Sequence, residues 1–195
     1  ALVAENGAVM PPAVFFTRGG CPPIDGVMKA KEPKCRRFAE RAARMAREED
    51  FAGVVISARW EQLEGRTHEV QLEGAWRPLN DVAAQAEAWR LLEEQVAGLV
   101  RQKKSVVLML PFPTGSAYMN PVRLIAPCQR LGTCARGPDI PDAFSRDEAE
   151  KATAHLSAIL RGIAARTGAA TLDPIAMLCN GSQCPLYAGD GTIVY

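Results

Sequence analysis

The sequence has little of what marks a membrane span, a secretory leader or a nucleic-acid-binding surface. Its 195 residues contain no uninterrupted apolar run of the length that a membrane-spanning helix needs, about 20 residues. The first residues, ALVAENGAVM, lack the basic segment and apolar core of a signal peptide. Basic and acidic residues are nearly balanced, 23 against 22, whereas nucleic-acid-binding domains carry a basic stripe. We therefore expect neither a nucleic-acid partner nor a membrane span within this chain.

Cysteine is the residue type that stands out. The six cysteines form three sequence-local couples, Cys21 with Cys35, Cys128 with Cys134, and Cys179 with Cys184. None of these has the Cys-x-x-Cys spacing or the nearby histidine that zinc would need, so no metal and no cofactor are expected. Local disulfides, and with them an oxidising compartment, are the favoured interpretation. The alternative is a cytosolic protein with six reduced cysteines.

The run 51–60, FAGVVISARW, predicts the central strand of the fold. Its apolar middle has no polar alternation, so both faces would be covered, as in a parallel sheet between helices. Ligands of such sheets bind beyond the carboxyl ends of the strands. Arg59 and Trp60 would then lie at the rim of an active site, whereas the alternative is that Trp60 only packs in the core.

Strand and helix patterns alternate along the rest of the chain. Apolar runs predict further strands over 13–16, 105–110 and 169–178. Helical periodicity predicts helices over 35–49, 81–104 and 145–167, with caps at Asn80 or Asp81 and at Ser145 and a stop at Gly168. The alternation indicates an α/β fold, a three-layer α/β/α sandwich with a mostly parallel sheet, as one domain over 1–195.

The loops and the two histidines add weaker signals. Gly19 and Gly20 follow the first strand, where adjacent glycines can present amide donors to an oxyanion or phosphate, although a plain turn is the more frequent explanation. The long loop 114–145 is expected to be functional or braced by a disulfide. His68 lies in a polar segment that predicts a loop or hairpin, and His155 lies on a helix face. Neither histidine is expected to be catalytic.

Five segments occur together in a specific order: GGCPPIDG with Cys35 downstream, VVISARW, LPFP, PCQR, and LDPIAMLCNGSQCPLYAGDGTIVY. As a set they resemble the extracytoplasmic SGNH-hydrolase-like domain that is fused behind membrane-bound acyltransferase three proteins. The resemblance covers nearly the whole chain. It implies an SGNH/flavodoxin-like fold at the periplasmic or extracellular face of the inner membrane. It also implies O-acylation, above all O-acetylation, of a polysaccharide or lipopolysaccharide acceptor, with the acyl group supplied by the fused membrane domain.

The resemblance also says where the chemistry would be. In that family the nucleophilic serine lies in a Gly-Asp-Ser-His stretch before the first helix, and the Asp and His lie in an Asp-x-x-His stretch after a tyrosine placed like Tyr195. Neither stretch is in this sequence, so the expected catalytic residues lie outside it. Gly19 and Gly20 are oxyanion candidates through their amides. The family's oxyanion asparagine has no counterpart here, which leaves the Arg59 guanidinium or the Trp60 indole N–H.

Three functions remain open at this point. The first is the SGNH-like domain of a polysaccharide O-acyltransferase, which would be inactive in the chain as given. The second is a secreted carbohydrate esterase, which would use water as the acceptor. The third is a non-catalytic glycan-binding module, which the absence of a triad favours. The oligomeric state is not predicted.

Overall fold

The computed structural model describes residues 13–48, 50–113 and 143–186. At the centre of the described chain is a parallel sheet of three strands in the order β2 (Gly53–Ile56), β5 (Ser105–Met109) and β7 (Ala170–Leu172). Gly53 allows β2 and β5 to approach closely, because a Cβ at this position would lie 3.0 Å from the Ser105 carbonyl oxygen. The predicted α/β class with a parallel sheet is confirmed.

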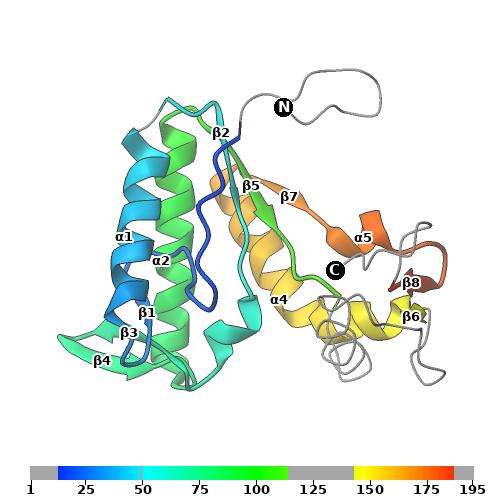
Figure 1. Ribbon diagram of the computed structural model, residues 1–195, viewed down its shortest axis with the longest axis horizontal. Helices are drawn as coiled ribbons and strands as arrows, with labels where there is room; N and C mark the ends of the chain where they lie inside the picture. The colour runs from blue at the N-terminus through cyan, green and yellow to red at the C-terminus, as the bar shows by residue number, and fades with distance from the viewer. Residues whose placement is uncertain (1–12, 49, 114–142, 187–195) are drawn as a thin grey trace, which may run out of the picture.

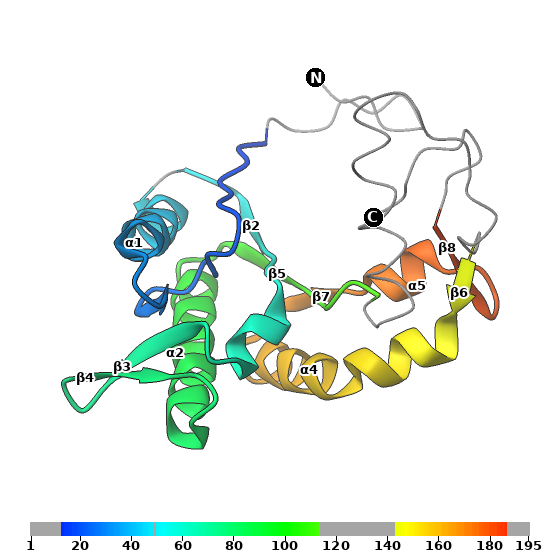
Figure 2. The same ribbon diagram turned by 60° about the horizontal axis from the view of Figure 1, so that its bottom comes forward.

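Three long helices are described. They are α1 (Pro33–Glu48), α2 (Val82–Arg101) and α4 (Arg146–Thr167). Figures 1 and 2 show α2 and α4 on the same side of the sheet. The core between them contains the apolar stripe of α2, which includes Leu92 and Val96, and the inward side chains of β5, Val106 and Leu108. Burying each such large side chain contributes about 1.5–3 kcal/mol.

The predicted helix ends are confirmed in atomic detail. The Asp81 carboxylate accepts a hydrogen bond from the Ala84 amide at 3.0 Å, and the Ser145 hydroxyl accepts one from the Glu148 amide at 3.3 Å. Each side chain satisfies an amide that has no partner inside the helix. Gly168 ends α4 with φ of +78°, a left-handed conformation that glycine adopts without strain.

Among the described strands, the stretch 51–60 does not take the central place that its sequence predicts. Among the described strands, β5 is central and β2 lies at an edge. The two faces of β2 differ, since Ile56 is 4% exposed while its neighbour Val55 is 60% exposed. The described strands differ from the prediction because an unbroken apolar run fits both a central strand and an edge strand. The described helices α2 and α4 cover one face of the sheet, so a three-layer sandwich stays a prediction.

Two antiparallel sheets flank the core. One has the order β1 (Val27–Lys29), β3 (His68–Leu72), β4 (Ala75–Pro78), and the other pairs β6 (Ala143–Ser145) with β8 (Gln183–Pro185). The hairpin around His68 is therefore confirmed.

Three predicted elements need correction. Residues 13–16 form no strand. Residues 143–145, expected in a loop, form β6. The strand predicted over 169–178 ends at Leu172, because Pro174 opens helix α5 (Pro174–Leu178), where its fixed φ and missing N–H are tolerated.

Two of the three predicted disulfides are present. Cys21 is bonded to Cys35 with the Cα atoms 5.2 Å apart, and Cys179 to Cys184 with the Cα atoms 4.0 Å apart. Cys128 and Cys134, with the rest of 114–142, lie outside the described residues. The first disulfide joins the segment before β1 to α1, and the second joins α5 to β8. No helix in the described ranges has the length and apolarity needed to cross a membrane.

Candidate functional site

The carboxyl ends of β2, β5 and β7 meet at one edge of the parallel sheet, which we call the carboxyl edge. In parallel α/β sheets this is the edge at which ligands bind. Arg59 and Trp60 follow β2, Phe112 follows β5, and Asp173 follows β7. The strand register therefore brings three separate parts of the sequence to one place, as the strand pattern predicts.

Trp60 is built into the fold. Its side chain is 1% exposed, and its indole N–H donates a hydrogen bond to the Met109 carbonyl oxygen at 2.8 Å. The ring also packs against Trp89, with the centroids 6.1 Å apart. Since Met109 ends β5, this contact joins the carboxyl ends of β2 and β5. The indole N–H is thus used within the protein, which favours a packing and positioning role for Trp60.

Arg59 differs from its neighbour in exposure. It precedes η1 (Trp60–Glu64), and its exposed side chain makes no hydrogen bond or ion pair with the described part of the chain. Buried Trp60 anchors the backbone directly after it. The Arg59 guanidinium is thus an exposed cation at the carboxyl edge, and its planar donors suit an anionic group.

Gly19 and Gly20 form a tight turn. The Cys21 amide donates to the Arg18 carbonyl oxygen at 3.2 Å, and Gly20, the third residue of the turn, has φ of +71°. A positive φ at this position is typical of a type II turn and favours glycine. The closing hydrogen bond uses neither glycine amide. A Cβ at Gly19 would meet nothing within 4 Å, so the turn borders open space.

Two residues that the sequence analysis did not select lie against this turn. The Nε2 atom of His68 is 2.9 Å from the Gly20 carbonyl oxygen, and His68 is 2% exposed. The Lys29 Nζ atom is 4.0 Å from the position of a Cβ at Gly20, and Lys29 pairs with His68 between β1 and β3. His68 is therefore buried, although it lies in a polar segment of the sequence. The strand alternation of HEVQL, which places His68 on the same face as buried Val70, is the signal that would have found it.

The environment of His68 favours the neutral imidazole. A carbonyl oxygen can only accept, so Nε2 carries the proton, and Nδ1 then accepts from the Thr67 hydroxyl at 3.0 Å. Burial lowers the pKa of His68 below its ordinary value, the hydrogen bond to Gly20 opposes this shift, and the charge of Lys29 adds to it. Both ring nitrogens are therefore occupied inside the protein.

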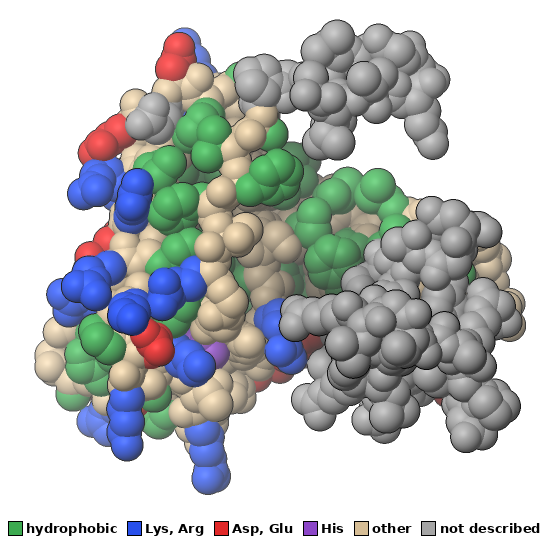
Figure 3. Space-filling view, viewed as in Figure 1, with side chains coloured by type: hydrophobic (Ala, Val, Ile, Leu, Met, Phe, Trp, Pro, Cys, Tyr) green, Lys and Arg blue, Asp and Glu red, His purple; other side chains and the backbone are tan. Residues whose placement is uncertain are grey.

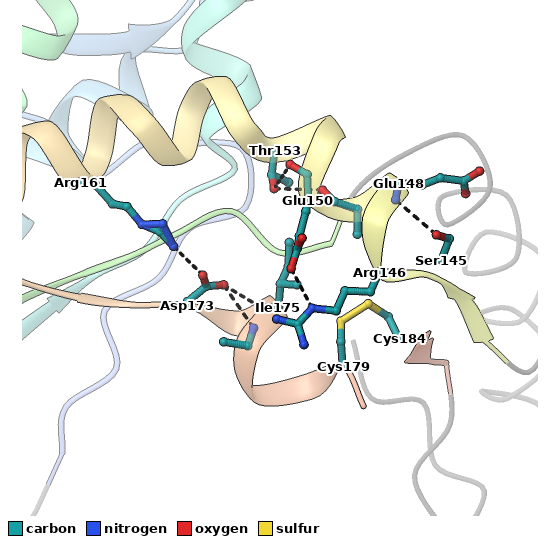
Figure 4. A network of polar contacts seen from close by, with 12 residues as sticks. Ser145, Arg146, Glu148, Glu150, Thr153, Arg161, Asp173, Ile175, Cys179 and Cys184 are labelled. Carbon is teal, nitrogen blue, oxygen red and sulfur yellow. Dashed lines mark hydrogen bonds and ion pairs between the residues drawn. A yellow bond between two sulfur atoms is a disulfide. The ribbon is translucent and has the colours of Figure 1, made fainter. Parts of the chain in front are cut away.

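Asp173, at the end of β7, serves the structure (Figure 4). One carboxylate oxygen accepts from the Ile175 amide at 3.0 Å and caps α5, and the other contacts the Arg161 guanidinium at 2.6 Å. The Cys179–Cys184 disulfide lies at the other end of α5. These contacts fix the corner between β7 and the segment that follows it.

Positive charge is concentrated beside the Gly19–Gly20 turn. Figure 3 shows lysine and arginine side chains along the α1 side of the molecule. Within α1, Arg36 and Arg44 are paired with Glu40 and Glu48, and the Arg41 guanidinium lies 5.5 Å from the Phe16 ring centroid. The disulfide from Cys35 joins this helix to the turn. Helix α1 therefore carries more basic than acidic residues, although the chain as a whole has a net charge of +1.

The other polar groups of the described ranges give no second site. His155 is exposed on α4, as its helical position predicts, with Nε2 3.2 Å from a Glu64 carboxylate oxygen. Within the described ranges, no three His, Cys, Asp or Glu side chains come together in a way that would hold a metal ion. The structure thus brings Gly20, His68 and Lys29 together and places Arg59 and Trp60 at the end of β2. An oxyanion or pocket role for Gly19, Gly20, Arg59 and Trp60 stays a prediction.

Comparison with known proteins identifies the family. The sequence model of the SGNH domain that is fused to AT3 domains matches residues 6–195. No curated protein and no solved structure matches the chain. The match covers almost the whole sequence, and it agrees with the order of segments and with the parallel sheet described above. The chain therefore belongs to the family of SGNH domains fused to AT3 acyltransferase domains.

Proposed function

We propose that this chain is the body of an extracytoplasmic SGNH domain that transfers an acyl group, specifically acetyl, to a hydroxyl of a cell-surface polysaccharide. The observation that carries the proposal is the family match over 6–195, since fusion to AT3 domains associates the domain with a membrane acyltransferase. The disulfides Cys21–Cys35 and Cys179–Cys184 support a location in the periplasm or on the extracellular face of the inner membrane.

The serine, histidine and aspartate of the triad are proposed to lie outside the chain 1–195. The serine hydroxyl, deprotonated by the histidine, would attack the carbonyl carbon of the acyl donor, and the donor would leave with the proton. A sugar hydroxyl, deprotonated by the same histidine, would then attack the serine ester and release the serine. Negative charge develops on the acyl oxygen in both steps, and donors aimed at that oxygen accelerate them.

The chain itself would supply the stabilisation of that charge. The amides of Gly19 and Gly20 lie on an open turn, with the Lys29 ammonium beside it. Arg59 adds a second cation at the carboxyl edge. The loop 114–145 is proposed to form part of the glycan surface, where a bound sugar in place of water would favour transfer over hydrolysis.

The face of the parallel sheet that α2 and α4 do not cover supports the prediction of a three-layer sandwich. Val55 is exposed on β2 although it lies in a run of apolar residues. In a complete domain, helices outside the described residues would cover this face and produce the three-layer α/β/α sandwich with a mostly parallel sheet.

The test uses the full-length protein that carries this domain, expressed from a plasmid in a strain from which the native gene has been deleted. The expected result is an acetyl ester on the cell-surface polysaccharide, detected by mass spectrometry and NMR, which disappears when the proposed serine is changed to alanine. Release of free acetate without esterified glycan would instead identify a carbohydrate esterase. Glycan binding with no acyl chemistry would identify a binding module, and either result would overturn the proposal.

A further inference from the structure

His68 is a buried titratable side chain for which the proposed transfer reaction gives no role. Its ring reaches from β3 to a turn that is distant in the sequence, and it donates to the Gly20 carbonyl oxygen at 2.9 Å. The Cys35 sulfur also lies 3.8 Å from that oxygen, but a disulfide sulfur has no proton to donate. The imidazole is therefore the donor that holds this carbonyl.

The contact fixes the orientation of one peptide group. The carbonyl of the Gly20–Cys21 peptide points to His68, and its N–H points to the Arg18 carbonyl at 3.2 Å. Both polar ends of the peptide plane are thus held from opposite sides. Since this plane is held from both sides and Cys21 is also held by the disulfide, the Gly20 end of the turn is anchored, which limits the conformations open to the two glycines.

We propose that His68 is a positioning residue for the oxyanion site, which it maintains by holding the Gly20 carbonyl so that the Gly19 and Gly20 amides stay directed toward the reacting acyl group. The inference rests on the proposed acyl transfer. His68 does not exchange protons with the substrate, because it is 2% exposed and both ring nitrogens have partners inside the protein.

Thr67 and Lys29 explain why a histidine suits this position. The Gly20 carbonyl, which can only accept, selects the tautomer with the proton on Nε2, and the Thr67 hydroxyl then donates to Nδ1 and orients the ring. The ammonium of Lys29 disfavours a second positive charge on the ring. The donor to Gly20 is therefore a neutral group that leaves the positive charge of Lys29 available to the anion next to the turn.

The experiment compares variants of the full-length protein in acetyl transfer to glycan. His68→Leu removes the donor, His68→Gln keeps an N–H that can reach the Gly20 carbonyl, and His155→Gln changes the exposed histidine as a control. We expect His68→Leu to lower kcat by about 10- to 100-fold with an unchanged KM for glycan, because displaced amide donors slow the reaction without weakening glycan binding. We expect His68→Gln to recover most of the loss and His155→Gln to match the wild type.

The outcomes separate the inference from the function on which it rests. Absence of transfer by the wild-type protein overturns both. Transfer by His68→Leu at the wild-type rate, or a raised KM with unchanged kcat, overturns the positioning role alone. If circular dichroism shows that His68→Leu does not fold, the exposed Thr67→Val decides. This variant removes the hydrogen bond that orients the imidazole at Nδ1, so we expect a several-fold lower kcat, and an unchanged kcat overturns the inference.

Discussion

The hydrogen bond between Trp60 and Met109 predicts that two neighbouring tryptophans differ in their contribution to stability. Trp60→Phe removes an indole N–H that donates at 2.8 Å from a side chain that is 1% exposed. A net hydrogen bond contributes about 0.5–1.5 kcal/mol, and a buried carbonyl left without its donor costs about 1–3 kcal/mol. The smaller ring of phenylalanine also loses packing contacts. From both effects we expect the free energy of unfolding to fall by about 2–3 kcal/mol.

Trp89 offers a matched control in the same cluster. Its indole Nε1 is buried without a hydrogen-bond partner in the described structure, and its ring packs on that of Trp60. Trp89→Phe therefore removes an unsatisfied donor together with some ring contact. These effects oppose each other, so we expect a change within about 1 kcal/mol.

The two variants are compared by urea unfolding of the 195-residue chain with its disulfides oxidised. Far-ultraviolet circular dichroism is the signal, because the tryptophan fluorescence itself changes. Equal m-values would show that both variants unfold in the same way. Equal losses of stability would refute the reasoning, because they would show that the bond to Met109 contributes nothing beyond ring packing.

Three further predictions concern the turn and the end of β7. Because the pKa of His68 is lowered from its ordinary value of 6.5, the unfolded chain takes up a proton that the folded chain does not, so stability should fall as the pH drops below 6.5 and level off below the folded pKa. The contribution of His68 to this fall amounts to at most about 1.4 kcal/mol per pH unit. Denaturant titrations at several pH values should show that His68→Gln removes this contribution and that His155→Gln does not. Gly20→Ala should lower the free energy of unfolding by about 1–2 kcal/mol because φ is +71°, while Gly19→Ala should be nearly neutral. Equal denaturation midpoints for the two variants would argue against the described turn conformation. Asp173→Ala should lower stability by about 1 kcal/mol in thermal unfolding, whereas Asp173→Asn, which keeps the cap of α5, should lose less.

Features set by nearby residues were predictable from the sequence. The caps at Asp81 and Ser145 and the stop at Gly168 depend on a few adjacent positions, and all three are present. The disulfides Cys21–Cys35 and Cys179–Cys184 close short loops whose ends are close in any compact structure. In each case the physical cause lies within one segment, so the local pattern is sufficient.

Features that depend on distant partners were not predictable in this way. The edge position of β2 depends on which strands pair with β5, and the valines of β2 carry no information about that. His68 is buried because β3 pairs with β1 and because Gly20 lies across from it, and neither partner is near it in the sequence. The corner at Asp173 is an intermediate case, since Pro174 was a local signal for the start of a helix.

The same distinction bears on how the proposed site would work. The Gly19–Gly20 turn is held by a turn hydrogen bond, a disulfide and His68, and all of these come from residues between 18 and 68. The proposed oxyanion site would therefore be formed before a nucleophile reaches it, and no reorganisation would be needed as charge develops on the acyl oxygen. Since the turn is exposed and Lys29 lies beside it, the nucleophile would need only to place its acyl oxygen against the Gly19 and Gly20 amides. The physical contribution of the chain to catalysis would then be the rigidity of this turn.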